Sequence, residues 1–383
     1  MATPSATPST PRFHFVDLLR GWAVLVMIET HVVNALLLPN IKEELSFKIF
    51  TFINGLVAPS FLFCAGFAFA ITLRRKWQEY ISTSMSFWRY AYRLLFILVV
   101  GYSLHIPIFS LRQLKELTDA SRWVPFFQVD ILQTISVTLM LLLILVVVMR
   151  KEMLFLLSSM TVVLVAIFFA PIIREWDYTA SPIWLRPYFT TQFKSQFPLF
   201  PWSAFLITGM LIGWWFLHSQ EKGSLLSTSK RLAILSLGGV LVSLLIEYLP
   251  IDVYPNHSFW RASPEFFFVR LGIVLISLVG LWWRERSHPP TGRSYLSLFG
   301  QESLLVYVVH LLVVYGYTYE LSFIRLFGPT LNYLECLGLF AVLTLAMYIL
   351  AYVWHWLKGW NKRLAQITEV VVLASIVAEF ILK

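Results

Sequence analysis

Long apolar segments recur along the whole chain, and they constrain its fold more than any other feature. A helix that crosses the hydrocarbon core of a bilayer needs about 20 residues. Ten segments reach this length, at about 14–38, 51–73, 88–108, 131–149, 153–171, 199–217, 231–249, 265–283, 299–319 and 333–357. A further segment, 364–382, is either an eleventh span or an interfacial helix, and we favour a span. We therefore predict an all-α polytopic membrane protein, a bundle of 10–11 transmembrane helices.

Composition and charge support this class. Of the 383 residues, 58% are hydrophobic and only 13% are charged, which excludes an ordinary soluble domain. The net charge of +9 does not indicate nucleic-acid binding, because Lys and Arg are concentrated at the N-terminus and in every second loop. Loops rich in Lys and Arg stay on the cytoplasmic side. We therefore predict a cytoplasmic N-terminus and no nucleic-acid partner.

The domain organisation is simple. Residues 1–12 are polar and rich in Pro, Ser and Thr, which predicts a disordered tail. Residues 13–383 form one transmembrane domain, because the loops are too short for a second one. The first apolar segment lacks a small-residue cleavage site, so we expect a retained helix. Cys64 and Cys336 both lie in apolar segments, so we expect neither a disulfide framework nor a metal site.

Residues 16–34 of the first span carry four ionisable side chains, Asp17, Arg20, Glu29 and His31. Such groups are costly inside a membrane unless they face a protein interior or a wet cavity. Arg20 and His31 are eleven residues apart, which is about 1100° of helix rotation and roughly 16 Å of rise, so they share one face. Asp17 is placed to pair with Arg20, and Glu29 faces elsewhere. A functional role for this helix is therefore our first hypothesis.

A second polar group precedes the fourth span. Asp130 is a good N-cap for that helix, and a capping role alone would account for it. Gln133 and Thr134 continue the same face, so a polar edge enters the membrane from the outer side, and Gln128, Asp130 and Gln133 could bind a hydroxylated substrate. His105, at the end of the third span, is also near the outer surface. A lone histidine there is more often a packing residue.

The eighth and ninth spans also carry polar residues, and each group could have either a structural or a functional role. Arg270 in the eighth span could form an ion pair with Glu247, Asp252 or Glu265, or contact a substrate carboxylate or phosphate. In the ninth span, polar residues follow one another at helical spacing and form a single stripe. Such a stripe most often joins helices, but it could also line a path across the bilayer. Its members are Ser303, Tyr307 and His310.

Glycine, proline and basic residues add local expectations. Gly21, Gly55 and Gly66 suit close packing of helices or a backbone opening beside a cavity. Pro198 and Pro201 suit the start of the sixth span or a kink in its first turn. The loop after the second span contains Arg74 and Arg75, together with Lys76. Topology explains this basic loop, which would also meet an anionic ligand arriving from the cytosol.

Several motifs together resemble a known family. DLLRGWAVLVMIETH (17–31), with Arg20, ten intervening residues and His31, resembles the first-helix motif of the type 3 membrane acyltransferases. The wider pattern is more similar to bacterial proteins related to heparan-α-glucosaminide N-acetyltransferase. The segments that carry this resemblance are VDLLRG (16–21), APSFLFCAGFAFA (58–70), VDILQTISVTLMLLL (129–143), PLFPWSAFLITGMLIG (198–213) and FGQESLLVYVVHLLVV (299–314).

The resemblance implies transfer of an acyl group, usually acetyl, from cytosolic acetyl-CoA to a sugar on the outer face. It also implies that His31 matches the catalytic histidine of the type 3 family and Arg20 its motif arginine. The lysosomal enzyme has Asn where His31 stands, so heparan itself is not assigned as the acceptor. An acceptor hydroxyl or amine needs a general base, which suits His31, and the phosphates of coenzyme A suit Arg20 and the basic loops.

We therefore predict an acyl-CoA-dependent O- or N-acyltransferase in a bacterial inner membrane. His31 is the expected general base, and Asp130 or Glu29 is expected to orient it. Partners are acyl-CoA, a sugar or glycan acceptor, the bilayer and, in one alternative, a second copy of the chain. A transporter or flippase for a polar or lipid-linked solute is the rival function, and an assembly protein is the third. The remaining candidates are Arg20, Arg74 and Arg75 for the donor, and His105, Gln128, Gln133, Arg270, Tyr307 and His310 for the acceptor.

Overall fold

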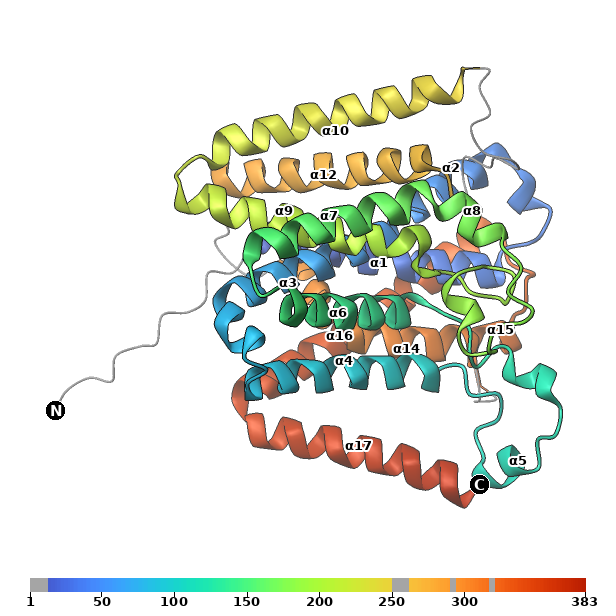
Figure 1. Ribbon diagram of the computed structural model, residues 1–383. Coiled ribbons are helices and arrows are strands. Elements are labelled where there is room, and N and C mark those ends of the chain that lie inside the picture. Colours follow the sequence, from blue (N-terminus) through green and yellow to red (C-terminus); the bar gives the residue numbers. More distant parts are fainter. Residues whose placement is uncertain (1–12, 250–261, 290–293, 317–320) are drawn as a thin grey trace.

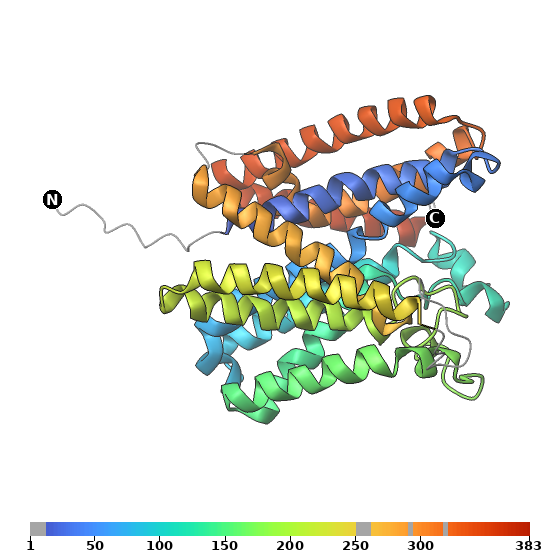
Figure 2. The same cartoon turned by 90° about the horizontal axis from the view of Figure 1, so that it is seen from above.

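The computed structural model describes residues 13–249, 262–289, 294–316 and 321–383. Within these ranges the regular secondary structure is helical, apart from one isolated β-bridge between Leu37 and Leu331. Long helices run from one end of the molecule to the other, and the short helices α5, α8 and α15 are all at the same end (Figures 1 and 2). The predicted all-α, polytopic class is confirmed. The tail predicted for residues 1–12 lies outside the described residues.

Each of the ten predicted spans overlaps a long helix, although the second and ninth spans each include a break between two helices. The long helices are α1 (His14–Leu36), α3 (Val57–Ile81), α4 (Met85–Ser103), α6 (Ile131–Met149), α7 (Glu152–Phe168), α9 (Leu199–Glu221), α10 (Leu225–Glu247), α12 (Pro264–Ser287), α14 (Ser303–Tyr315), α16 (Tyr333–Trp360) and α17 (Lys362–Leu382). The shorter ones are α2 (Leu45–Asn54), α5 (Leu111–Lys115), α8 (Ala170–Glu175), α13 (Tyr295–Gln301), α15 (Phe323–Leu326) and the 3₁₀ turns Ile41–Glu43, Ala120–Trp123 and Arg186–Tyr188.

Seven of the described helical segments are long and apolar enough to cross a membrane, or eight if the bent pair α13–α14 is one span. α17 is among them, so the last segment has the length and composition of a span. Three helices at predicted spans are not among them: α1 and α4 carry ionisable side chains, and α7 is short. The total of 10–11 spans therefore remains a prediction that depends on counting α1, α4 and α7.

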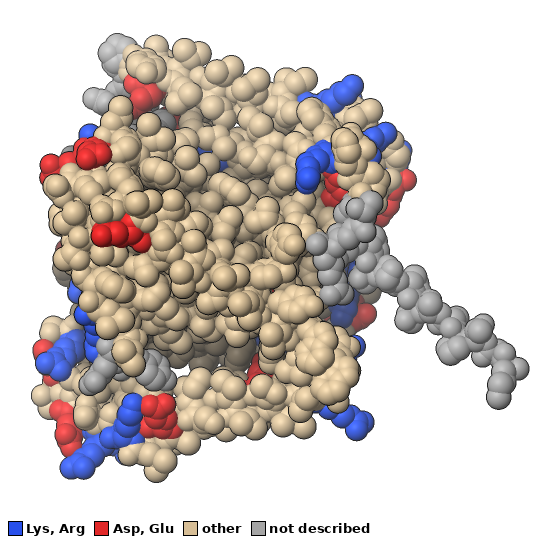
Figure 3. Space-filling model, turned by 180° about the vertical axis from the view of Figure 1, so that it is seen from behind, with Lys and Arg blue, Asp and Glu red and all other residues tan. Residues whose placement is uncertain are grey.

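An apolar belt surrounds the molecule. Figure 3 shows Lys, Arg, Asp and Glu gathered toward the two ends, with few charges between them. Large apolar side chains such as Ile234 on α10, Leu345 on α16 and Val370 on α17 are more than half exposed. Apolar surface of this kind is stable in contact with lipid. The belt therefore marks the part of the fold that lies in the bilayer.

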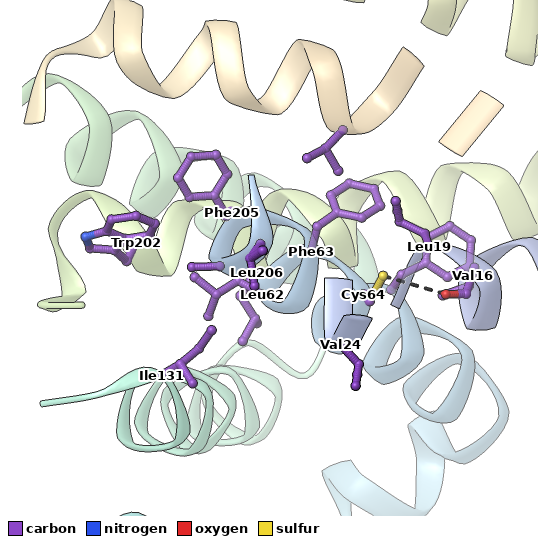
Figure 4. Close-up of a cluster of buried hydrophobic side chains, with 14 of the residues drawn as sticks. Val16, Leu19, Val24, Leu62, Phe63, Cys64, Ile131, Trp202, Phe205 and Leu206 are labelled. Atoms are coloured by element: carbon purple, nitrogen blue, oxygen red, sulfur yellow. Dashed lines mark hydrogen bonds between the residues drawn. The ribbon is translucent and has the colours of Figure 1, made fainter. Parts of the chain in front are cut away.

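Glycines let the central helices approach closely. A Cβ atom at Gly66 on α3 would lie 1.8 Å from the carbonyl oxygen of Leu206 on α9, and one at Gly21 on α1 would lie 1.8 Å from that of Leu296 on α13. These contacts confirm the packing role predicted for Gly21 and Gly66. Around the α3–α9 contact, apolar side chains from α1, α3, α6 and α9 form a common core (Figure 4).

The ninth predicted span is not one straight helix. α13 and α14 meet at Glu302 and are bent by 87°, so the prediction of a continuous segment over 299–319 is wrong. Glu302 is only 5% exposed, and its carboxylate accepts hydrogen bonds from Lys358 Nζ at 2.5 Å and His355 Nδ1 at 2.9 Å, both on α16. A buried carboxylate needs such partners, and this requirement favours the break. α13 then packs across α1.

Candidate active site

Polar side chains from four parts of the fold meet near the end of the molecule opposite the start of α1. His31 lies five residues before the end of α1, and His310 lies five residues before the end of α14. Asp130 immediately precedes α6, and His105 follows α4. α1 packs directly against α14, so the two helices that carry His31 and His310 are neighbours. Residues as far apart in the chain as His31 and His310 thus form one cluster.

His31 has two aromatic neighbours. Its Nδ1 is 3.1 Å from the hydroxyl oxygen of Tyr315, with the two rings edge to face. The ring centroids of His31 and His310 are 5.2 Å apart. His31 keeps some accessible surface, whereas His310 is completely buried. His31 is therefore the residue of this pair that is not completely enclosed by the protein.

The hydrogen bond of His310 fixes its tautomer. Its Nδ1 is 2.7 Å from the carbonyl oxygen of Val306, and since a carbonyl only accepts, Nδ1 carries the proton. In the neutral ring Nε2 is then an acceptor. This buried atom has no hydrogen-bond partner among the described residues. Buried polar atoms of this kind normally meet water or a ligand.

Asp130 combines a cap with a site contact. One carboxylate oxygen, Oδ1, accepts from the backbone N–H of Ile131 at 2.8 Å, and the Gln133 side chain accepts from the Asp130 N–H at 3.2 Å, completing a capping box. The other oxygen, Oδ2, accepts from the Tyr307 hydroxyl at 3.2 Å and lies 3.7 Å from His105 Nε2. The predicted N-cap is confirmed, and half of the carboxylate faces the cluster.

Asp130 is ionised at neutral pH. Burial acts to raise the pKa of its carboxyl, but the hydrogen bond and charge of His105 and the N–H of Ile131 hold that pKa below its ordinary value. The charge of Asp130 also acts on His31. Glu29, the other residue expected to orient His31, is instead hydrogen-bonded by Asn54 at the α2–α3 junction. Of the two carboxylates expected to orient His31, Asp130 is therefore the one that belongs to the cluster.

The loop before α9 fixes the segment that carries Asp130. Ser195 Oγ accepts from the N–H of Val129 at 2.9 Å, and the N–H groups of Gln196 and Phe197 donate to the carbonyl of Val129 at 3.1 and 3.2 Å. The Thr134 hydroxyl donates to the Phe197 carbonyl. These contacts hold the start of α6 in place. α9 follows Pro198, and Phe200 is non-helical in its first turn, so the predicted proline effect is confirmed.

The remaining acceptor candidates differ in position. Gln128 donates from Nε2 to His105 Nδ1 at 2.9 Å, so both belong to the cluster. Gln133 is completely buried behind Asp130, and its Nε2 has no partner among the described residues. The predicted stripe on α14 is present, since Tyr307 contacts Asp130 and His310 contacts His31. Direct contact of any of these residues with a substrate stays a prediction.

Arg270 lies apart from the contacts of this cluster. Its Nη1 donates to the carbonyl of Gly55 at 2.5 Å, at the junction of α2 and α3, and its guanidinium lies 4.1 Å from the ring centre of Phe266. Among the described residues it pairs with neither Glu247 nor Glu265, so the expected ion pair with either one is wrong. Asp252 lies outside the described residues. A carbonyl left free by the break between α2 and α3 explains the contact.

The three donor candidates lie toward the other end. Arg20 Nη2 is 2.8 Å from Asp17 Oδ1, which confirms the predicted pair, and the buried Nε of Arg20 has no partner among the described residues. Arg74 donates to Glu221 at 3.1 Å from Nε and lies over the ring of Trp214. Arg75 is exposed. Nε of Arg20 and Nη1 of Arg74 are thus both buried N–H groups without a partner among the described residues, and the Arg75 side chain is open to solvent.

Tyr315 is the site residue that the sequence did not predict. It follows His310 by five residues, which places it about 140° away around an ideal helix and off the polar stripe. Its contact with His31 depends on how α14 crosses α1. Within the described residues no group of three or more His, Cys, Asp or Glu could hold a metal ion.

Comparison with known proteins assigns the family. The family model described as heparan-alpha-glucosaminide N-acetyltransferase, catalytic, matches residues 12–250, which is more than half of the chain. This range contains α1 with Arg20 and His31, and Asp130 at the start of α6. No curated protein matches the chain. The chain is a multi-pass membrane protein, and it belongs to the family of the heparan-alpha-glucosaminide N-acetyltransferase catalytic domain.

Proposed function

We propose that this protein transfers an acetyl group from acetyl-CoA to a hydroxyl or amine of a sugar or glycan, with His31 as the general base. The observation that carries the proposal is the position of His31. It is partly accessible, and it lies beside a buried histidine and within the field of an ionised carboxylate. Family membership supports acetyl transfer as the reaction class.

The chemical step needs one proton acceptor. The acceptor oxygen or nitrogen attacks the thioester carbonyl carbon while Nε2 of His31 takes its proton. The carbon–sulfur bond then breaks, coenzyme A leaves as a thiolate, and His31 returns the proton to sulfur. Acetyl-CoA and the acceptor thus give the acetylated acceptor and coenzyme A. Asp130 stabilises the imidazolium that forms between the two proton transfers.

The donor enters from the end that carries Arg20, which the positive-inside rule assigns to the cytoplasm. Arg20 and Arg75 bind its phosphates through charge-assisted hydrogen bonds. The acceptor reaches His31 from the opposite side, near His105 and Gln128. The rise of about 16 Å between Arg20 and His31 requires an extended donor. We place the protein in a bacterial inner membrane, with homodimer formation as a further expectation.

The test is acetyl-CoA binding and thiol release by purified protein supplied with a pool of amino sugars and glycans. His31→Gln is expected to reduce turnover by about 10²- to 10⁴-fold, the usual contribution of a general base. Arg20→Ala is expected to weaken acetyl-CoA binding. His218→Gln, at the exposed end of α9, is the matched histidine control and should behave as wild type.

The rival function makes a different prediction. Folded wild-type protein that neither binds acetyl-CoA nor releases thiol, but moves a polar or lipid-linked solute across vesicles, would overturn the acetyltransferase proposal. His31 and Asp130 would then be intramembrane groups of a transport path, as such residues often are. If His31→Gln and wild type turned over at equal rates, the proposed reaction would stand, but His31 would not be its general base.

A further inference from the structure

Tyr315 makes the polar contact of the His31 ring that decides what His31 can do. The hydroxyl oxygen lies 3.1 Å from Nδ1 of His31. Either atom could supply the hydrogen, and the two cases have opposite consequences. If the phenol donates, the neutral ring carries its proton on Nε2 and cannot accept there. If Nδ1 donates, Nε2 is the free base.

The proposed role of His31 distinguishes the two cases. Nδ1 is occupied by the contact with Tyr315, so Nε2 is the ring nitrogen left to take a proton from the acceptor. A neutral imidazole carries one N–H and accepts at its other nitrogen. His31 can therefore act as the base only if Nδ1 carries the hydrogen and the phenol oxygen of Tyr315 accepts it.

We propose that Tyr315 is a positioning residue that holds His31 in the tautomer protonated on Nδ1, so that Nε2 is free to take the acceptor's proton. The inference rests on the proposed function, because it assigns His31 the form that a general base needs. Which ring nitrogen is protonated is set by the hydrogen bond of the other nitrogen, and for His31 that bond is the one with Tyr315.

The neighbouring histidine shows the same arrangement built in another way. His310 donates from Nδ1 to the Val306 carbonyl at 2.7 Å, which requires no assumption about direction. Both imidazoles of the pair then carry their proton on Nδ1. The difference is that a backbone carbonyl fixes the tautomer of His310, whereas a side-chain hydroxyl fixes that of His31. Substitution of Tyr315 by Phe removes this hydroxyl. His31 is therefore the histidine of this pair whose tautomer a conservative substitution can release.

The direct test is a nitrogen NMR spectrum of protein labelled with ¹⁵N-histidine, with His31→Gln used to assign the signals of His31. The wild type is expected to show the form protonated on Nδ1 for His31. In Tyr315→Phe, which keeps the ring and its packing, this form should give way to a mixture of tautomers. Tyr348→Phe is the matched control, since the Tyr348 hydroxyl on α16 makes no hydrogen bond with the described residues.

Kinetics supply a second readout. Tyr315→Phe is expected to lower kcat for acetyl transfer by about 10- to 100-fold, as loss of a partner that orients a histidine commonly does, with KM for acetyl-CoA unchanged. Thermal unfolding verifies that each variant is folded. A wild-type tautomer together with wild-type kcat in Tyr315→Phe would overturn the inference. Absence of turnover in wild type would overturn the proposed function alone, because the spectrum still reports the tautomer.

Discussion

At the scale of single residues, Asp130 shows how one carboxylate serves both fold and site. Oδ1 caps α6 through the N–H of Ile131, while Oδ2 meets the Tyr307 hydroxyl and lies near His105. The cap fixes the position of the carboxylate, and the cluster uses its charge. The cap needs a hydrogen-bond acceptor at Oδ1, whereas the cluster needs the negative charge. A substitution can therefore remove one and keep the other.

Asp130→Asn should remove the charge and keep the cap, since Asn and Asp are nearly equal N-caps. We expect the free energy of unfolding to change by less than about 1 kcal/mol, and kcat to fall at least tenfold because the His31 imidazolium loses its counter-charge. Thermal unfolding and thiol release measure the two effects. Asp130→Ala is the comparison that loses both, with a cap cost of about 1 kcal/mol. Equal kcat for wild type and Asp130→Asn would remove Asp130 from the mechanism.

At the scale of elements, close contacts between helices decide where the site residues meet. α3 and α9 approach through Gly66 and Gly209, where a Cβ atom would lie 1.8 Å from the Leu206 oxygen and 2.1 Å from the Phe63 oxygen. α1 and α13 approach in the same way through Gly21 and Gly300. In a membrane, helices gain little from the hydrophobic effect when they associate, so close packing contributes more of their attraction.

Gly66→Ala should therefore be strongly destabilising, because the obstacle is a backbone oxygen and cannot turn aside. We expect α3 and α9 to move apart. The free energy of unfolding should fall by more than the roughly 1–3 kcal/mol that an extra methyl group usually costs in a packed core. Gly238→Ala is the control, since nothing lies within 4 Å of a Cβ there, and it should gain up to about 1 kcal/mol of helix propensity. Thermal unfolding in one detergent compares both with wild type. Equal stability of the two variants would contradict the packing.

At the scale of the whole molecule, the two ends of the described chain lie at opposite ends of the bundle. α1 begins at one end, and α17 finishes at the other (Figure 1). Charged residues gather at both ends, with an apolar belt between them (Figure 3). Helices that alternate in direction from α1 to α17 would give an odd number of crossings, with Arg75 and Lys383 on opposite sides of the membrane.

Labelling of single cysteines tests this topology. The native Cys64 and Cys336 are both buried, so Arg75→Cys and Lys383→Cys introduce the reactive thiols. In intact cells a membrane-impermeant thiol reagent should label Lys383→Cys and leave Arg75→Cys unlabelled until the cells are opened. Labelling of Arg75→Cys alone would reverse the orientation. Equal protection of both would mean that α17 lies on the cytoplasmic side and does not cross.

Much of the fold was predictable because its causes are local. Apolar length located a helix at each of the ten predicted spans, and Asp130, Pro198 and Gly66 had the local roles expected of their residue types. The break at Glu302 was not predictable from the apolar pattern of that span, because it depends on Lys358 and His355 more than fifty residues later. Arg270 likewise found a backbone carbonyl on α2–α3, where the sequence suggested carboxylates.

The sequence by itself determined the class of the protein, the helix that carries Arg20 and His31, and the family. These follow from apolar segment length and from the order of residues within single helices, both of which are properties of the linear chain. The meeting of His31 with Tyr315, His310 and Asp130 was decided only by the tertiary structure. The physical reason is that helix crossing sets these distances, and crossing depends on glycine contacts and buried ion pairs between segments far apart in the chain.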